Sequence, residues 1–145
     1  MKKNVKIHWN CNKTWKKSAY NTSWCLLGCS IGDFGTILFF QMYDFNISSL
    51  VIMFLAIING LITSVILETI ILIKELGYRK SLFTALNMSF ISMISMEITM
   101  NLTDLILVGE ARLVFWVIPI MLFVGFLTPW PYNYWRLKKY NISCH

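Results

Sequence analysis

The sequence predicts an all-α fold, an integral membrane bundle of four transmembrane helices with both termini in the cytoplasm. Composition supplies the first two observations: 57% of the 145 residues are hydrophobic and only 14% are charged, whereas a soluble domain carries about 25% charged residues. The third observation is that four apolar stretches are each long enough to cross a bilayer as a helix, which takes about 20 residues. A soluble globular domain is thereby excluded.

The elements follow one another with short connections. Residues 1–22 are polar and lysine-rich, so we expect a cytoplasmic N-terminal segment and no cleavable signal peptide before the first span. Residues 23–131 form the predicted transmembrane domain, and residues 132–145 a basic cytoplasmic tail. The predicted spans are residues 24–43, 47–73, 82–108 and 113–130.

Prolines and aromatic residues mark the end of the fourth span. The stretch "TPWPYNYWRLKKY" predicts a helix stop, because proline lacks an N–H and pushes the preceding residue out of the α region. Amphipathic aromatic rings are most stable at the membrane–water interface. The predicted interface anchors are Trp24, Trp130, Tyr132 and Trp135.

The basic residues predict the orientation. Of the 13 lysines and arginines, only Arg112 falls on the side opposite to the termini, and basic residues near span ends stay cytoplasmic. The chain is therefore expected in the cell membrane as a multi-pass protein. Topology accounts for the net charge of +6, and no nucleic-acid partner is expected. The cytoplasmic set is Lys2, Lys3, Lys6, Lys13, Lys16, Lys17, Lys74, Arg79, Lys80, Arg136, Lys138 and Lys139.

One face of the first span is unusually polar. At 100° per residue, Cys25, Cys29 and Asp33 fall in one sector of the helix. Gly28, Gly32 and Gly35 are predicted helix-packing positions, because glycine lets another helix approach closely. In a reducing cytoplasm the cysteines of the chain are not expected to form disulfides. Metal ligation and inert packing in a tight crossing remain the two readings of the cysteine pair.

The third span carries the other polar face. Glu97, Asn101 and Asp104 follow helical spacing, and an intramembrane carboxylate indicates function because it must turn toward protein or water. A protonated Glu97 bonded to a neighbouring helix is the alternative. Asp33 and Glu97 are expected to face the bundle interior with polar neighbours. Their depths differ by roughly 9 Å at a rise of 1.5 Å per residue, which argues against direct contact.

Sulfur side chains accompany these carboxylates. Met93, Met96 and Met100 lie along the third span, and thioether and thiolate ligands suit Cu(I). Adaptable core filling is the other role of methionine. In the second span, Glu68 lies about 180° from Asn59, so the two side chains cannot face the same seam.

These patterns leave two functions open. No P-loop, dinucleotide fingerprint, nucleophile elbow or zinc-protease motif occurs in the sequence, so an enzyme is not expected. One hypothesis is binding or transport of a soft metal ion, Cu(I), along the methionine, carboxylate and cysteine positions. The alternative is a non-catalytic accessory subunit of a larger membrane complex, for example a membrane-bound copper enzyme. Four short spans with little exposed domain also favour a homo-oligomer or a complex.

Three stretches carry a family resemblance. "WCLLGCSIGD", "SFISMISME" and "GFLTPWPYNYWRLKK" resemble a family of small multi-span proteins catalogued as domain of unknown function 4396, over most of residues 22 to 139. In the family pattern a histidine precedes the first cysteine, where this chain has Trp24. The resemblance implies an integral membrane protein and names no reaction. The matching residues are Cys25, Gly28, Cys29, Gly32, Asp33, Ser92, Glu97, Pro131 and Asn133.

Overall fold

The computed structural model describes residues 10–43 and 45–139, and every regular element in this part of the chain is a helix. The elements are α1 (Asn12–Tyr43), α2 (Ser49–Leu76), α3 (Tyr78–Thr84), the π-helix η1 (Ala85–Ser89), α4 (Phe90–Val108), α5 (Ile118–Leu127) and α6 (Trp130–Lys139). The all-α prediction is confirmed for these residues.

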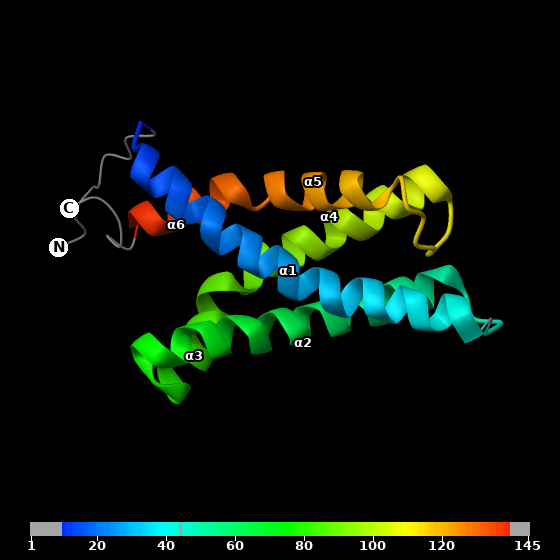
Figure 1. Ribbon diagram of the computed structural model, residues 1–145, viewed down its shortest axis with the longest axis horizontal. Coiled ribbons are helices and arrows are strands. Elements are labelled where there is room, and N and C mark those ends of the chain that lie inside the picture. The colour runs from blue at the N-terminus through cyan, green and yellow to red at the C-terminus, as the bar shows by residue number, and fades with distance from the viewer. Residues whose placement is uncertain (1–9, 44, 140–145) are drawn as a thin grey trace.

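The long helices alternate in direction. In Figure 1, α1 runs from left to right, α2 returns beside it, α4 runs to the right again, and α5 leads back to α6 at the left. The start of α1 and the whole of α6 therefore lie at the same end of the bundle. The connections at residues 45–48 and 109–117 lie at the opposite end. Helices α1 and α2 form the most extensive pair, and α4 packs against both of them.

Within residues 10–43 and 45–139, three helices are long and apolar enough to cross a membrane, namely Asn12–Tyr43, Ser49–Lys74 and Phe90–Val108. The fourth predicted span, 113–130, contains a shorter helix. Its helix α5 has only 10 residues, which at 1.5 Å per residue gives about 15 Å, half of the ~30 Å hydrocarbon core. Pro119 lies in the first turn of α5 and Pro129 follows its end. A proline provides no N–H for the helix ladder, which limits α5 at both ends.

The two terminal segments are more helical than the sequence indicated. Helix α1 begins at Asn12, well before residue 23, and α6 occupies much of the predicted tail. Contacts between the two explain this. Ser18 donates a hydrogen bond to the Trp130 carbonyl at 3.0 Å, and Asn133 donates one to the Thr22 hydroxyl at 2.8 Å. Tertiary packing thus stabilises helix in two polar segments, a contribution that local sequence patterns do not reveal.

The third predicted span, 82–108, is not one continuous helix. Gly77 has φ +75°, a conformation that glycine adopts readily, and it separates α2 from the short α3. The π-helix η1 then joins α3 to α4. Gly109, with φ +85°, ends α4 in the left-handed conformation and donates its N–H to the Leu105 carbonyl at 3.0 Å. This is a common helix C-terminus.

The outer surface is apolar and the interior is partly polar. Ile31, Phe54 and Ile106 are 59%, 64% and 72% exposed, while Asp33 and Glu97 are fully buried. A water-soluble protein has the reverse distribution. In a bilayer, apolar side chains face lipid and polar groups face the protein interior. The fold is therefore that of a membrane protein.

Candidate functional site

The glycine step of α1 packs against α2. A Cβ on Gly28 would lie 2.6 Å from the Ser64 Cα, and one on Gly32 would overlap the Asn59 carbonyl. Close approach lets Thr63 donate a hydrogen bond to the Gly28 carbonyl at 2.7 Å. The seam formed by these glycines thus joins the first and second spans, and not the first and third.

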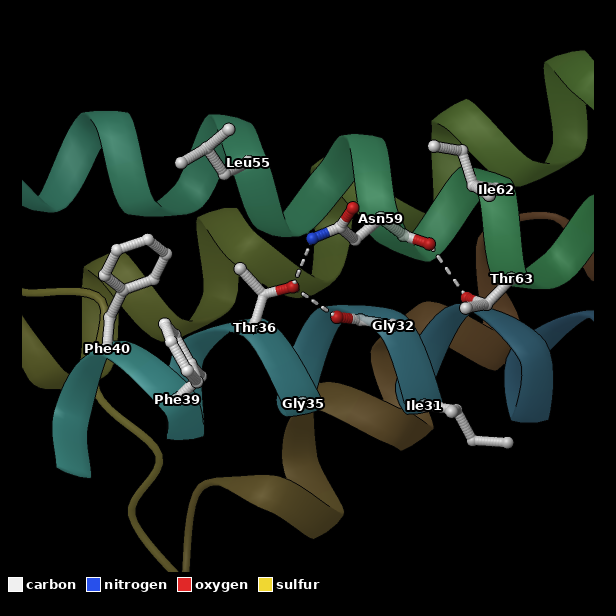
Figure 2. Close-up of a pocket in the computed structure, with 10 residues that line it drawn as sticks. All are labelled: Ile31, Gly32, Gly35, Thr36, Phe39, Phe40, Leu55, Asn59, Ile62 and Thr63. Atoms are coloured by element: carbon white, nitrogen blue, oxygen red, sulfur yellow. Dashed lines mark hydrogen bonds between the residues drawn. The ribbon is translucent and has the colours of Figure 1, made fainter. Parts of the chain in front are cut away.

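Gly35 does not pack as the sequence indicated. A Cβ placed there would meet no atom within 4 Å. Gly35 lines an outward-facing groove of about 530 Å³ between α1 and α2, which Figure 2 shows. At the base of this groove Asn59 donates a hydrogen bond to the Thr36 hydroxyl at 2.8 Å. The two helices are still in contact at Thr36, so the open space at Gly35 arises because Gly35 lies on the side of α1 that faces the groove.

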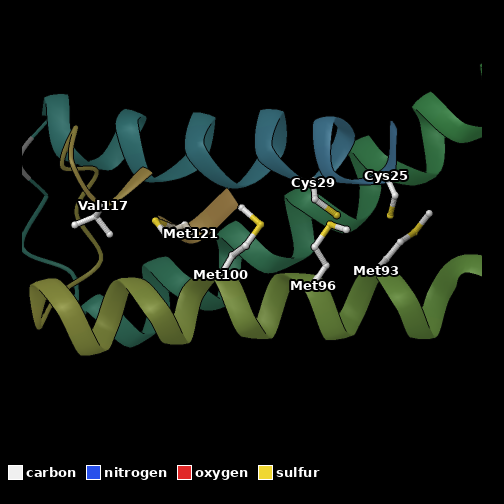
Figure 3. Packing of buried hydrophobic residues seen from close by; sticks show 7 residues of the cluster. All are labelled: Cys25, Cys29, Met93, Met96, Met100, Val117 and Met121. Atoms are coloured by element: carbon white, nitrogen blue, oxygen red, sulfur yellow. The ribbon is translucent and has the colours of Figure 1, made fainter. Parts of the chain in front are cut away.

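The five cysteine and methionine residues that the sequence singled out lie together. The structure adds Met121 of α5, and the six side chains form what we call the sulfur cluster, between α1, α4 and α5 (Figure 3). Cys25 is 6% exposed and the other five are 0% exposed. The sulfur cluster consists of Cys25, Cys29, Met93, Met96, Met100 and Met121.

The two cysteines occupy one end of the sulfur cluster. The Cys25 Sγ lies 3.5 Å from the Ser64 Oγ, and Ser64 donates a hydrogen bond to the Cys25 carbonyl at 3.2 Å. Cys29 lies beside Cys25 and beside the Glu97 carboxyl group. Both cysteines are free thiols. Cys11, by contrast, is disulfide-bonded, so the expectation that no cysteine forms a disulfide was wrong for this residue.

Met121 was missed because its helix is hydrophobic on all sides. In such a helix no polar face indicates which side turns inward. A signal was nevertheless present four residues later, at Gly125, which lies on the same side of α5. A Cβ on Gly125 would lie 2.6 Å from the Met100 Cγ, so α5 and α4 approach closely there. The Met-x-x-x-Gly spacing therefore identifies the face of α5 that meets the sulfur cluster.

A polar seam runs beside the sulfur cluster between α1 and α4. Asn101 donates hydrogen bonds to the Asp33 Oδ1 at 3.0 Å and to the Glu97 carbonyl at 3.1 Å. Nearer the end of α4, the Asp104 Oδ2 accepts the Arg112 backbone N–H at 3.3 Å. Asp33, Glu97, Asn101 and Asp104 are all buried. The helical spacing of these residues thus places them inside the bundle, with Asn101 next to Asp33.

Glu97 is the least satisfied member of the seam. Both of its carboxyl oxygens are buried, and among the described residues no N–H or O–H group donates to them; the neighbouring Cys29 thiol is only a weak donor. The carboxyl group lies against Gly60 of α2, where any side chain would overlap the Glu97 Oε1. Gly60 was not identified from the sequence, since an isolated glycine in an apolar helix carries no pattern. A buried carboxyl without a partner is costly, and a cation or proton at this place would remove that cost.

Glu68 and Asn59 point to different places, as their angular separation indicated. Asn59 faces α1, whereas Glu68 accepts a hydrogen bond from the Ser89 hydroxyl at 2.5 Å. Ser89, the last residue of the π-helix, also accepts a hydrogen bond from Arg136 Nη1 at 3.3 Å. The other Glu68 oxygen, Oε2, is buried without a partner.

The predicted aromatic anchors lie around α6 and the first turns of α1. Trp130 packs edge-on against Trp15 at 5.2 Å between ring centroids. Tyr132 lies 5.9 Å from Trp135, whose ring also carries the Lys139 ammonium group at 4.7 Å. Trp24 lies further along α1, with its ring 6.1 Å from that of Tyr20.

Metal binding by histidine, cysteine or carboxylate alone is not supported. In the described part of the chain, no three such side chains gather closely enough to hold a metal ion. A metal in the bundle would therefore need the methionine thioethers as well as the two thiols. His8, Cys144 and His145 fall outside the described residues.

The chain was compared with known families and proteins. The model of the family described as "Domain of unknown function (DUF4396)" matches residues 14–141. No curated protein and no solved structure matches the chain. The matched range includes the residues of the sulfur cluster and of the polar seam.

Proposed function

Because the chain belongs to the DUF4396 family, which assigns no activity, we propose a function from the site itself. The protein binds a soft metal ion, Cu(I), in the sulfur cluster and passes it through the bundle of the cell membrane. Soft thiolate and thioether ligands select Cu(I) over harder ions.

One observation carries the proposal: six sulfur side chains from three helices gather in one buried cluster. Methionine and cysteine also serve as ordinary core filling, and that role requires only that they be buried. Here they form a row. Figure 3 displays the sulfur atoms in succession along the bundle, from Met121 through Met100 to Cys25. Neighbouring ligands in a row allow an ion to move from one set to the next without losing coordination.

The Glu97 carboxyl group supports a cationic ligand. It lies beside the Cys29 thiol, a weak donor, and no N–H or O–H group of the described residues donates to its oxygens. A monovalent cation held by the adjacent sulfur atoms would offset the charge of a carboxylate in this low-dielectric place. A purely apolar core would gain nothing from a carboxyl group at this point.

The arrangement of α6 supports a fourth crossing. Three crossings by α1, α2 and α4 leave the end of α4 on the side opposite to the start of α1. Helix α6 nevertheless lies against the start of α1, through the hydrogen bond from Ser18 to Trp130. This placement supports our proposal that residues 113–130 return across the membrane through α5 and its irregular flanks. Lys138 and Lys139, at the end of α6, favour the cytoplasm for this side, whereas the disulfide bond of Cys11 favours an oxidising compartment. We propose the cytoplasmic orientation, and labelling decides between the two.

Topology is tested with cysteines introduced at the two ends of the bundle. The native cysteines are replaced by serine, since the disulfide-bonded Cys11 cannot serve as a probe. On intact cells, a membrane-impermeant maleimide should label Asn46→Cys and should label Lys139→Cys only after permeabilisation. Labelling of Lys139→Cys from outside would overturn the orientation.

Metal content of the purified protein tests the proposed function. We expect copper in the wild-type protein after expression with copper, and a loss to background in Cys25→Ser and Cys29→Ser. Met96→Leu and Met100→Leu should lower the copper content, because each removes a thioether while nearly conserving volume.

Met42→Leu is the matched control, since Met42 is 72% exposed and lies outside the sulfur cluster. This variant should retain the wild-type copper content. Equal, near-zero copper in every sample would leave the sulfur cluster as packing alone.

A second candidate function is that of an accessory subunit, and the groove of Figure 2 favours it. The groove exposes the backbone at Gly35 and the polar side chain of Asn59 on the outer face of two spans. Small residues and polar groups at such a surface promote association with another membrane helix. Purification in mild detergent tests this: a partner that is retained by the wild type and lost in Gly35→Leu supports the accessory role.

A further inference from the structure

A small cavity of about 70 Å³ lies between α1 and α2, near the end of the bundle that carries α6. We call it the portal cavity, and the residues that matter are Tyr20, Trp24 and Cys25 of α1 and Glu68 and Leu72 of α2. One water occupies about 30 Å³ of the liquid. The portal cavity is therefore large enough for a water molecule or for a cation that has lost most of its hydration shell.

The portal cavity reaches the sulfur cluster. Cys25 lines it, and Cys25 is also the only member of the cluster with measurable exposure, 6% against 0% for the other five. Cys29, one turn further along α1, does not line the portal cavity and is completely enclosed. The Cys25 thiol is therefore the first sulfur atom that an ion in the portal cavity would meet.

A carboxyl group lines the opposite wall. Glu68 is anchored through its Oε1 by the Ser89 hydroxyl, at 2.5 Å. Arg136 donates a hydrogen bond to Ser89 at 3.3 Å, and its positive charge acts on the Glu68 carboxyl group. The Glu68 Oε2 is buried and accepts no hydrogen bond among the described residues. Glu68 lines the portal cavity and Arg136 does not, so a cation in the cavity lies nearer to the carboxylate and is attracted more strongly than a neutral molecule.

We propose that the portal cavity is the access site through which a soft monovalent cation passes between the α6 end of the bundle and Cys25, with Glu68 as the residue that attracts it. This inference rests on the proposed function, because it supplies the route to the sulfur cluster. The ligand class is a soft monovalent cation, of which Ag(I) is a convenient probe.

Thiol modification kinetics test the portal cavity without any metal. The full-length chain in detergent, with Cys11→Ser and Cys144→Ser, reacts with neutral methyl methanethiosulfonate or with its cationic 2-aminoethyl analogue. Mass spectrometry of peptides follows Cys25 and Cys29 separately. We expect Cys25 to react with both reagents and Cys29 to react at least about tenfold more slowly, since a fully buried thiol is inert.

Charge at Glu68 is tested by the ratio of the two rates at Cys25. Glu68→Gln should lower the cationic-to-neutral rate ratio by roughly threefold to tenfold and leave the neutral reagent unaffected. Glu110→Gln is the matched control, because Glu110 is an exposed carboxylate paired with Arg112 and lies away from the cavity. Leu72→Trp should fill the cavity and slow both reagents. A ratio unchanged in Glu68→Gln, or equal reactivity of Cys25 and Cys29 in the parent chain, would overturn the proposal.

Two readouts separate this proposal from the metal function. Slow modification of Cys29 in every variant reports an intact bundle, so an unfolded variant is recognised directly. Added Ag(I) should protect Cys25 if the sulfur cluster binds soft cations. Selective, charge-dependent modification without Ag(I) protection would retain the portal cavity and refute the metal function. Ag(I) protection without charge-dependent modification would support the metal function and refute the role of the portal cavity.

Discussion

Two glycines of α1, seven residues apart on the helix, provide a matched test of the packing between α1 and α2. A Cβ on Gly28 would lie 2.6 Å from the Ser64 Cα, which belongs to the backbone and cannot rotate away. Carbon atoms pack best at about 3.5–4.0 Å, so Gly28→Ala forces the helices apart by roughly 1 Å. At Gly35, a Cβ would meet nothing within 4 Å.

The difference between the two variants isolates the clash. Replacing glycine by alanine in a helix stabilises it by up to about 1 kcal/mol, and this gain applies to both variants. Overpacking a close contact costs about 1–3 kcal/mol. Separation of the helices also weakens the hydrogen bond from Thr63 to the Gly28 carbonyl, which measures 2.7 Å, and such a bond is worth about 0.6 kcal/mol in a membrane protein. Gly28→Ala should therefore be less stable than Gly35→Ala by about 1–3 kcal/mol.

Reversible unfolding in mixed micelles of mild detergent and sodium dodecyl sulfate measures the free energy of unfolding of both variants. Helical circular dichroism and tryptophan fluorescence provide two independent signals. Equal stability of Gly28→Ala and Gly35→Ala would refute the close approach of α1 and α2 at Ser64.

Two further substitutions test the interior. Asn101→Leu removes the donor to Asp33 and leaves a buried carboxyl group unpartnered, so the free energy of unfolding should fall by about 1–3 kcal/mol. Thr103→Ala is the control and should change the free energy of unfolding little, because the Thr103 hydroxyl donates to a carbonyl of its own helix. Equal losses in both variants would contradict the polar seam. Gly125→Ala places a Cβ 2.6 Å from the Met100 Cγ, so it should destabilise the wild type more than it destabilises the Met100→Ala variant. A double-mutant cycle with no coupling would argue against contact between α5 and the sulfur cluster.

The sequence was most informative where a polar or sulfur residue interrupts an apolar helix. Glu97, Asn101 and Met100 share a helical face, and the apolar remainder of α4 leaves only one direction for that face to point. Their burial and the gathering of the sulfur side chains could therefore be predicted. In the apolar α5 no such contrast exists, and neither Met121 nor the limited length of the helix was identified from the pattern.

Pairing between helices was less predictable. A small-residue step indicates that a helix will come close but does not say which helix. Here the partner of Gly28 is Ser64 of α2, and the site that receives Glu97 is the isolated Gly60. Helix formation in the terminal segments could not be predicted for a different reason. Ser18 and Thr22 stabilise the helix through hydrogen bonds to α6, which lies more than 100 residues later in the sequence.

The docking of α6 on α1 has a consequence for the order of assembly. Ser18 and Thr22, among the first helical residues to be synthesised, bond to Trp130 and Asn133, which lie 112 and 111 positions later in the chain. Contacts of such long sequence separation form late, because the intervening chain must be ordered first. During synthesis, the first helix must enter the bilayer with these hydroxyls bonded to its own backbone or to water. The bundle can close at that end only after α6 has been synthesised, and a chain truncated before Trp130 would retain the three long helices but stay open there.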